Sequence, residues 1–253
     1  MKKLLVVILL ISGFLQAEAQ KQKVNHMTTY DSKVLHFGFS LGLNALDFGV
    51  THYNPIGMNP DFQSKSWAED NEQITDASFV RTDVAGTIPG FTVGIVSSLR
   101  LTQDLNLRFL PGLSFGDRKL FYNIPVWDID NYQPMQYYSI KSTFLDFPLL
   151  IKYKARRINN NRPFVIFGPA YRQDISRTGK DDLVKLKGGG FYAEVGAGWD
   201  HYFTFFRFSV EAKVSIGLNN QLGDPPGPNQ RQYYTNAIEN LRSKIFTLCF
   251  HFE

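Results

Sequence analysis

The chain has 253 residues, with 27 Lys and Arg against 23 Asp and Glu, so its formal net charge is +4. The basic residues are scattered rather than grouped, which gives no reason to expect a nucleic-acid partner. Cys249 is the single cysteine, which excludes an internal disulfide and a cluster of thiolate metal ligands. Aromatic residues make up 15% of the chain, and this high share needs a structural explanation.

The N-terminus has the pattern of a secretory signal. Lys2 and Lys3 precede the apolar run Leu4–Phe14, and Ala17-Glu18-Ala19 fits a cleavage site. The apolar run is shorter than the ~20 residues that a membrane-spanning helix needs, which favours a cleaved signal over an anchor. We therefore expect a signal peptide over residues 1–19, a periplasmic segment over 20–33 and one domain over 34–253.

Residues 207–218 alternate polar and apolar side chains without interruption. Arg207, Glu211 and Lys213 fall on one face, and Val210 and Ile216 fall on the other. A strand of this length, tilted by roughly 45°, can cross a bilayer, and one wet face opposite one apolar face is typical of a transmembrane β-barrel. The same alternation occurs in eight segments in all, at about residues 34–44, 91–99, 105–115, 143–153, 164–174, 191–200, 207–218 and 244–252.

The connections between these segments alternate in length. Short pieces over 100–104, 154–163 and 201–202 alternate with long ones over 45–90, 116–142, 175–190 and 219–243. Outer-membrane barrels have short periplasmic turns and long external loops. The sequence therefore predicts an all-β fold, an eight-stranded antiparallel up-and-down transmembrane β-barrel with long external loops. Its predicted place is the outer membrane of a Gram-negative bacterium, with both chain ends in the periplasm.

The inward faces of the predicted strands carry equal numbers of positive and negative charges. Eight strands enclose a lumen that side chains can fill, and buried charges need partners. This favours an internal ion-pair plug over a selective conduit or proton path. The residues of this predicted lumen network are Arg108, Asp146, Lys152, Arg172, Asp174, Glu194, Asp200, Arg207, Glu211 and Lys213.

The sequence gives little support for an enzyme. Five histidines are candidates for a Ser/His site, but none has a serine at a recognisable spacing, and no Gly-x-Ser-x-Gly motif occurs. No paired-histidine pattern indicates a metal and no phosphate-binding loop indicates a nucleotide. We expect a protein without catalytic residues, resident metal or cofactor. The histidines are His26, His36, His52, His201 and His251.

Two groups of residues are candidates for contact with other molecules. Trp127, Tyr137 and Tyr138 lie in the second long connection, where aromatic side chains either bind a partner or dip into the membrane interface. Arg156 and Arg157 lie in a basic periplasmic turn, which either touches a partner or is simply solvated.

Three stretches of the chain resemble the PorT (SprT) family of outer-membrane barrels, components of the type IX secretion system. The most specific of their runs are Leu-Arg-Phe-x-Pro-Gly-Leu-Ser-Phe-Gly and Ser-Thr-Phe-Leu-Asp-Phe-Pro-Leu-Leu. Other outer-membrane barrels share a Glu-x-Pro-Leu-Leu-x-Lys-Tyr pattern in the fourth strand. The stretches are Phe37–Asn44, Pro89–Val96 continuing into Leu107–Arg118, and Lys141–Lys154.

The resemblance implies a role in moving cargo proteins with C-terminal sorting domains across the outer membrane, in support of surface enzymes or gliding motility. It implies other secretion subunits and outer-membrane lipid as partners, and it supplies no catalytic residues. Two alternatives stay open. One is a general outer-membrane barrel anchor or surface adhesin, and the other is an outer-membrane lipid-modifying enzyme.

Overall fold

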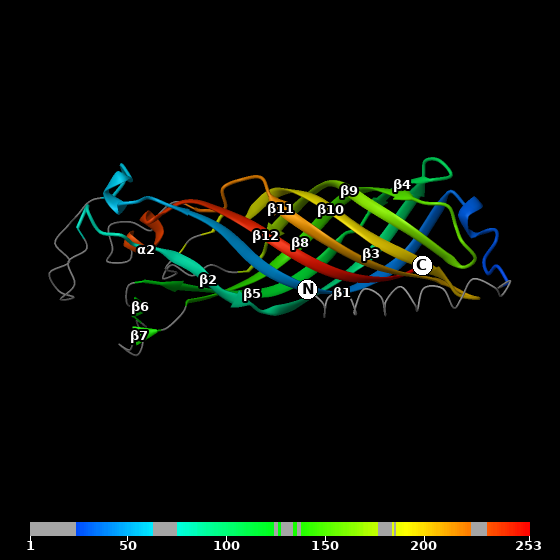
Figure 1. Ribbon diagram of the computed structural model, residues 1–253, viewed down its shortest axis with the longest axis horizontal. Coiled ribbons are helices and arrows are strands. Elements are labelled where there is room, and N and C mark those ends of the chain that lie inside the picture. The colour runs from blue at the N-terminus through cyan, green and yellow to red at the C-terminus, as the bar shows by residue number, and fades with distance from the viewer. Residues whose placement is uncertain are drawn as a thin grey trace, which may run out of the picture.

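The structure is a computed structural model that describes residues 24–62, 75–123, 126–127, 134–135, 138–176, 184, 186–223 and 232–253. The predicted signal peptide over residues 1–19 lies outside these residues. Long twisted strands dominate the described part and run the length of the molecule (Figure 1). They are β1 (Leu35–His52), β2 (Thr82–Thr87), β3 (Pro89–Arg100), β4 (Leu105–Phe109), β5 (Gly112–Tyr122), β8 (Tyr138–Lys154), β9 (Asn161–Asp174), β10 (Gly189–Tyr202), β11 (Arg207–Gly217) and β12 (Ile238–Phe252).

The remaining elements are short. A two-stranded ribbon of β6 (Val126–Trp127) and β7 (Pro134–Met135) stands apart from the main sheet. Single turns of helix occur at η1 (Tyr30–Ser32), η2 (Ile56–Met58) and α2 (Gln232–Asn236). Within the described ranges, no helix is both long enough and apolar enough to cross a membrane.

The main sheet closes on itself, because β1 pairs antiparallel with both β12 and β3. From β12 the order runs through β11, β10, β9 and β8 to β4 and β5, and from there back to β3. Two walls of the barrel are interrupted strands, β2 with β3 and β4 with β5. Counting each as one wall gives eight, so the predicted eight-stranded antiparallel barrel is confirmed.

The interruption in the third predicted strand has a local cause. Pro111 has no N–H to give to the ladder, and Gly112 resumes the strand after it. The polar groups at the break still find partners, since Ile95 N donates to Pro111 O at 2.9 Å and Leu110 N donates to Pro148 O at 3.2 Å. Neighbouring strands therefore hold both halves in one wall.

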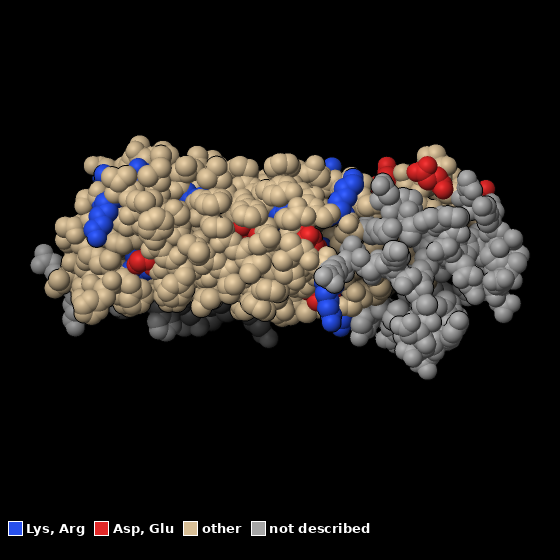
Figure 2. Space-filling view, turned by 180° about the vertical axis from the view of Figure 1, so that it is seen from behind, with Lys and Arg blue, Asp and Glu red and all other residues tan. Residues whose placement is uncertain are grey.

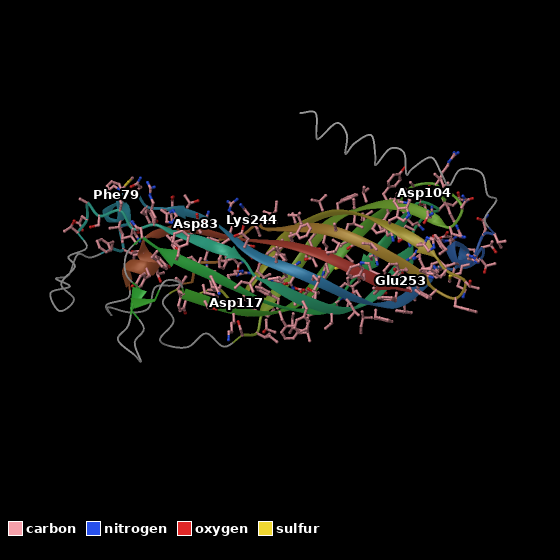
Figure 3. The ribbon with its side chains drawn as sticks, turned by 60° about the horizontal axis from the view of Figure 1, so that its bottom comes forward. Phe79, Asp83, Asp104, Asp117, Lys244 and Glu253 are labelled. Atoms are coloured by element: carbon pink, nitrogen blue, oxygen red, sulfur yellow. The ribbon has the colours of Figure 1, made fainter. Side chains whose placement is uncertain are left out.

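The two ends of the barrel differ as the connection lengths predict (Figure 1). Residues 101–104, 155–160 and 203–206 join strands at one end, which we call the turn end. Residues 53–81, 123–137, 175–188 and 218–237 connect strands at the other, the loop end. Figure 3 labels Asp104 and Glu253 at the turn end and Phe79 and Asp83 at the loop end.

Several strands run farther towards the loop end than predicted. β1 continues to His52, β8 begins at Tyr138 and β12 begins at Ile238. The extra residues include polar side chains on the outward face, such as Lys141 and Arg242. Beyond the lipid band the outward side chains become polar while inward ones such as Ile140 and Ile238 are apolar, so the pattern of an apolar outside and a polar inside ends although pairing continues.

The middle of the barrel presents apolar side chains outward. Figure 2 shows a broad face with few charged residues between the two ends. Large apolar side chains around the outside of the barrel are between 39% and 65% exposed, which suits contact with lipid and accounts for part of the aromatic content. They include Phe37, Phe39, Leu41, Leu43, Phe91, Ile95, Leu99, Phe109, Phe147, Leu149, Val165, Phe167, Phe191, Val195, Trp199, Val214, Ile216 and Phe246.

Candidate functional site

The lumen is filled by two groups of paired charges. The first, the turn-side cluster, lies nearer the turn end. Arg108 binds Glu211 at 2.9 Å with Nη1 and Glu253 at 3.1 Å with Nη2. Arg207 binds the other oxygen of Glu253 at 2.5 Å. Glu253 therefore bridges two guanidinium groups that come from β4 and β11, and it ties separate walls of the barrel together.

Asp200 completes the turn-side cluster. Its carboxylate lies 2.7 Å from Lys152 Nζ and 3.8 Å from Arg207 Nη1, and it accepts a hydrogen bond from Ser209 at 2.6 Å. Lys152 Nζ also lies 3.6 Å from the ring centre of Phe164. These charges come from four strands and are buried, so each depends on the partners facing it.

The second group, the loop-side cluster, is centred on Arg172 and Glu194. Arg172 Nη2 binds Glu194 at 2.5 Å, and Arg172 Nε lies 3.6 Å from Asp146. Lys213 Nζ binds the other oxygen of Glu194 at 3.0 Å. Ser114 donates a hydrogen bond to Asp146, so the carboxylates of this cluster are neutralised and bound from several sides.

The structure thus joins nine of the ten predicted lumen residues in ion pairs. Asp174 differs. It sits at the last position of β9, and its Oδ1 accepts hydrogen bonds from the N–H and hydroxyl of Ser176. The alternation correctly placed Asp174 on the inward face. Because Asp174 lies at the end of its strand, Ser176 in the following turn binds its carboxylate. Among the described residues, Glu253 takes the place in the ion-pair network that the sequence pattern gave to Asp174.

The N-terminal segment closes the turn-end mouth. Tyr30 is 7% exposed. Its ring stacks on His36 with centroids 4.0 Å apart and lies 4.8 Å below the guanidinium carbon of Arg207. Burial raises the pKa of Tyr30 above its usual range, so the phenol stays neutral in this position. The mouth is therefore filled by a residue from outside the strands.

Asp31 joins the same segment to the barrel walls. Its carboxylate accepts a hydrogen bond from Tyr202 at 3.0 Å and lies 3.3 Å from Arg162 Nη1 and 3.9 Å from Lys154 Nζ. Arg100 donates to the Asp31 carbonyl at 3.0 Å. Contacts with β3, β8, β9 and β10 hold this one residue, which the sequence pattern predicts only as part of a periplasmic segment over residues 20–33.

An apolar cap closes the loop end. Loop residues Ile56, Val80 and Val184 pack against inward residues of four strands, and each is at most 2% exposed. Arg118 lies below this cap with its guanidinium 4.1 Å from the ring centre of Phe48. The full cap consists of Phe48, Ile56, Phe62, Val80, Leu120, Tyr122, Ile140, Val184, Tyr234, Ala237, Ile238 and Leu241.

The residues predicted to contact a partner lie in different surroundings. Arg157 donates to the His26 carbonyl at 2.5 Å and stacks 3.8 Å over the ring of Tyr202, so it holds the N-terminal segment. Arg156 is exposed. Tyr138 packs against the loop-end cap. The side chain of Trp127 and the whole of Tyr137 lie outside the described residues.

The histidines weighed as catalytic candidates lie in separate places. His36 is buried under Tyr30 at the mouth, and His251 lies in the lumen beside Glu211 at 3.3 Å. His201 belongs to β10 and its Nδ1 lies 2.7 Å from Asn161 Oδ1. His52 Nε2 accepts a hydrogen bond from Thr82 N at 3.0 Å.

Comparison with known proteins agrees with this architecture. A model of the outer membrane protein β-barrel domain family matches residues 18–223. This chain belongs to that family. Outer-membrane barrels have short periplasmic turns and long external loops, so the turn end is the expected periplasmic end and the loop end the expected external end. A search of curated proteins gave no match.

Several solved barrels resemble the chain in part. Neisserial surface protein A is 10% identical, with a TM-score of 0.42 over 87% of this chain and 98% of that one. The outer membrane protein OprG from Pseudomonas aeruginosa is 9% identical, with a TM-score of 0.41 over 87% and 91%. The N-terminal β-barrel domain of Pseudomonas aeruginosa OprF is 12% identical, with a TM-score of 0.31 over 84% and 96%.

Proposed function

We propose that this protein is a non-enzymatic outer-membrane component of protein secretion, of the type IX kind, that acts through its surfaces. The observation that carries this proposal is the filled lumen. Between the mouth held by Asp31 and the loop-end cap, the interior is occupied by the two ion-pair clusters. A barrel filled in this way offers cargo no route through its centre, so its contribution comes from what its ends and outer wall bind.

The turn end supplies the exposed groups that would bind other secretion subunits. Arg156 points to solvent from the connection between β8 and β9. Phe205, in the connection between β10 and β11, is 90% exposed, and Phe203 and Phe206 beside it are partly exposed. A basic group and an aromatic turn at the same end of the barrel suit a partner protein on the periplasmic side, while the apolar belt suits outer-membrane lipid.

The experiment is a clean deletion of the gene followed by fractionation of medium and periplasm. Cargo with C-terminal sorting domains is expected to accumulate in the periplasm of the deletion strain, and the wild-type gene is expected to restore export. Complementation with Arg156→Ala and Phe205→Ala together separates binding from folding, since neither side chain is buried. Normal export in the deletion strain contradicts the proposal.

A surface adhesin or anchor is the second candidate, and the packed cap at the loop end favours it. The cap carries exposed apolar side chains at its rim, where Met58 is 65% exposed and Phe79 is 57% exposed. This candidate predicts that export stays normal in the deletion strain while attachment to surfaces falls. A lipid-modifying enzyme predicts instead a changed outer-membrane lipid profile in that strain.

A further inference from the structure

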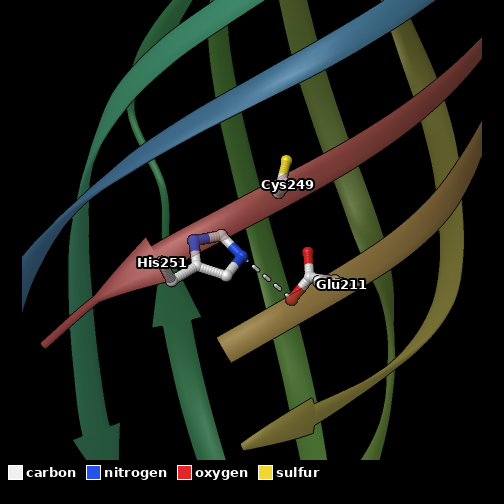
Figure 4. Close-up of side chains that lie close together, drawn as sticks. All are labelled: Glu211, Cys249 and His251. Atoms are coloured by element: carbon white, nitrogen blue, oxygen red, sulfur yellow. Dashed lines mark ion pairs between the residues drawn. The ribbon is translucent and has the colours of Figure 1, made fainter. Parts of the chain in front are cut away.

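Three side chains with metal-binding atoms meet inside the lumen. Cys249 and His251 stand two residues apart on β12, so both face inward, and Glu211 on β11 lies directly opposite Cys249. Their ligand atoms, one from each residue, all lie within 4.8 Å of one another. Figure 4 shows the imidazole of His251 turned towards Glu211 across the two strands, with Cys249 beside His251 on β12.

The donor atoms of this cluster are not used up by the surrounding protein. Glu211 Oε1 and both ring nitrogens of His251 are buried without a hydrogen-bond partner, although His251 Nε2 lies 3.3 Å from Glu211 Oε2. Glu211 and His251 are at most 1% exposed. Unpaired buried polar atoms are costly, so Glu211 Oε1 and His251 Nδ1 are available to a bound species.

The nearby positive charges bind oxygens other than Glu211 Oε1. Arg108 binds the other carboxylate oxygen of Glu211, Oε2, and Glu253. Lys213 binds Glu194 at 3.0 Å. Glu211 Oε1 is therefore left to a second cation. On the neighbouring strand β1, Gly42 leaves room for the sulfur, because a Cβ at that position would lie 3.2 Å from Cys249 Sγ.

We propose that Glu211, Cys249 and His251 form a site for one divalent transition metal of the Zn²⁺ class. Sulfur, imidazole nitrogen and carboxylate oxygen are the donors that Zn²⁺ takes, in a four-coordinate arrangement that leaves one position for water. Binding forms one bond to each residue and releases the thiol proton of Cys249 to solvent. The metal fastens β11 to β12 inside the lumen and enters during folding, because the folded cluster is buried.

The first test uses the full mature chain, refolded in detergent with Co²⁺ and then passed over a chelating column. We expect about one cobalt per chain and a thiolate-to-cobalt charge-transfer band in the near-ultraviolet spectrum. Refolding with Zn²⁺ is expected to give the same stoichiometry. Folded wild-type protein that retains neither metal overturns the proposal, without reference to any variant.

The second test uses Cys249→Ser and His251→Gln. Each is expected to lower the retained metal about 10-fold or more, since even residues that only support a ligand commonly cost 10- to 100-fold. His201→Gln is the matched control, because His201 bonds Asn161 on the outer face, and it is expected to retain wild-type metal. Folding is checked by heat-modifiable mobility on gels. Wild-type metal content in folded Cys249→Ser and His251→Gln overturns the proposal.

Discussion

The hydroxyl of Tyr202 donates to the carboxylate of Asp31 at 3.0 Å, although the two residues are 171 positions apart in the chain. Tyr202 ends β10, and Asp31 lies in the segment before the first strand. The same carboxylate faces Arg162 and Lys154. The segment before β1 is therefore part of the folded barrel and not a free tether.

Replacing Asp31 by Asn tests this contact. The change leaves Arg162 and Lys154 without the carboxylate that faces them both, so we expect a loss of about 1–3 kcal/mol in the free energy of unfolding. Urea titration of the barrel in lipid vesicles measures it, and faster hydrogen exchange over residues 24–34 is expected alongside. Lys33→Ala, at an exposed position, is the control. Unchanged exchange in Asp31→Asn would show that the segment is held by other contacts.

Replacing Arg172 by Met tests the loop-side cluster. Glu194 and Asp146 then lose a buried partner, and removing one member of a buried ion pair commonly costs 3–5 kcal/mol, so we expect a destabilisation of about 3 kcal/mol or more. The same urea titration measures it. Arg242→Met removes a charge from an exposed position on the outer wall and should stay within about 0.5 kcal/mol. Equal losses in the two variants would contradict the ion-pair account.

Replacing Ile56 by Ala tests the loop-end cap. Ile56 is fully buried at 0% exposure, and truncating a buried aliphatic side chain to Ala typically costs about 2–5 kcal/mol. We expect protease cleavage within residues 53–81 to become faster in vesicles where the barrel itself stays folded. Met58→Ala, two residues away and 65% exposed, should leave the cleavage rate unchanged. If residues 53–81 stay resistant to the protease in Ile56→Ala, the packing of Ile56 does not hold the cap in place.

Cysteine labelling of intact cells tests the orientation. Asn59 and Asn160 are natural choices from loop length alone, but both are buried, at 7% and 6% exposure. Met58→Cys and Ile158→Cys are better, because their side chains are 65% and 68% exposed at opposite ends. A membrane-impermeant maleimide should label position 58 and not 158, while native Cys249, buried at 4%, stays unlabelled. The reverse pattern would invert the topology.

Side chains along a strand point alternately to its two faces, and this two-residue repeat explains why the lumen charges could be predicted. Arg207, Glu211 and Lys213 sit at alternate positions of a strand, so one regular pattern assigns all of them to one face. The same regularity puts Cys249 and His251 on one face of β12. It did not show that Glu211 stands opposite Cys249, because register depends on how two strands pair and not on either strand alone.

The residues that close the two ends of the barrel do not follow an alternating pattern in the sequence. Tyr30 and Asp31 precede the strands, and Ile56 and Val80 lie in connections, so no periodicity marks them as buried. Their burial follows from contacts between parts of the chain that are far apart in sequence. Arg118 was missed for a related reason, since it lies beyond the predicted end of its strand at residue 115, where outward polar residues interrupt the alternation.

The filled lumen is the central claim, and ion conductance across a planar lipid bilayer tests it most directly. The purified mature chain, shown to be folded by its gel mobility, is inserted at low density and the current is recorded under voltage. A lumen occupied by the turn-side and loop-side clusters predicts no stepwise current from wild-type protein. Stable, uniform current steps from wild-type protein would contradict it and turn attention to a conduit through the barrel.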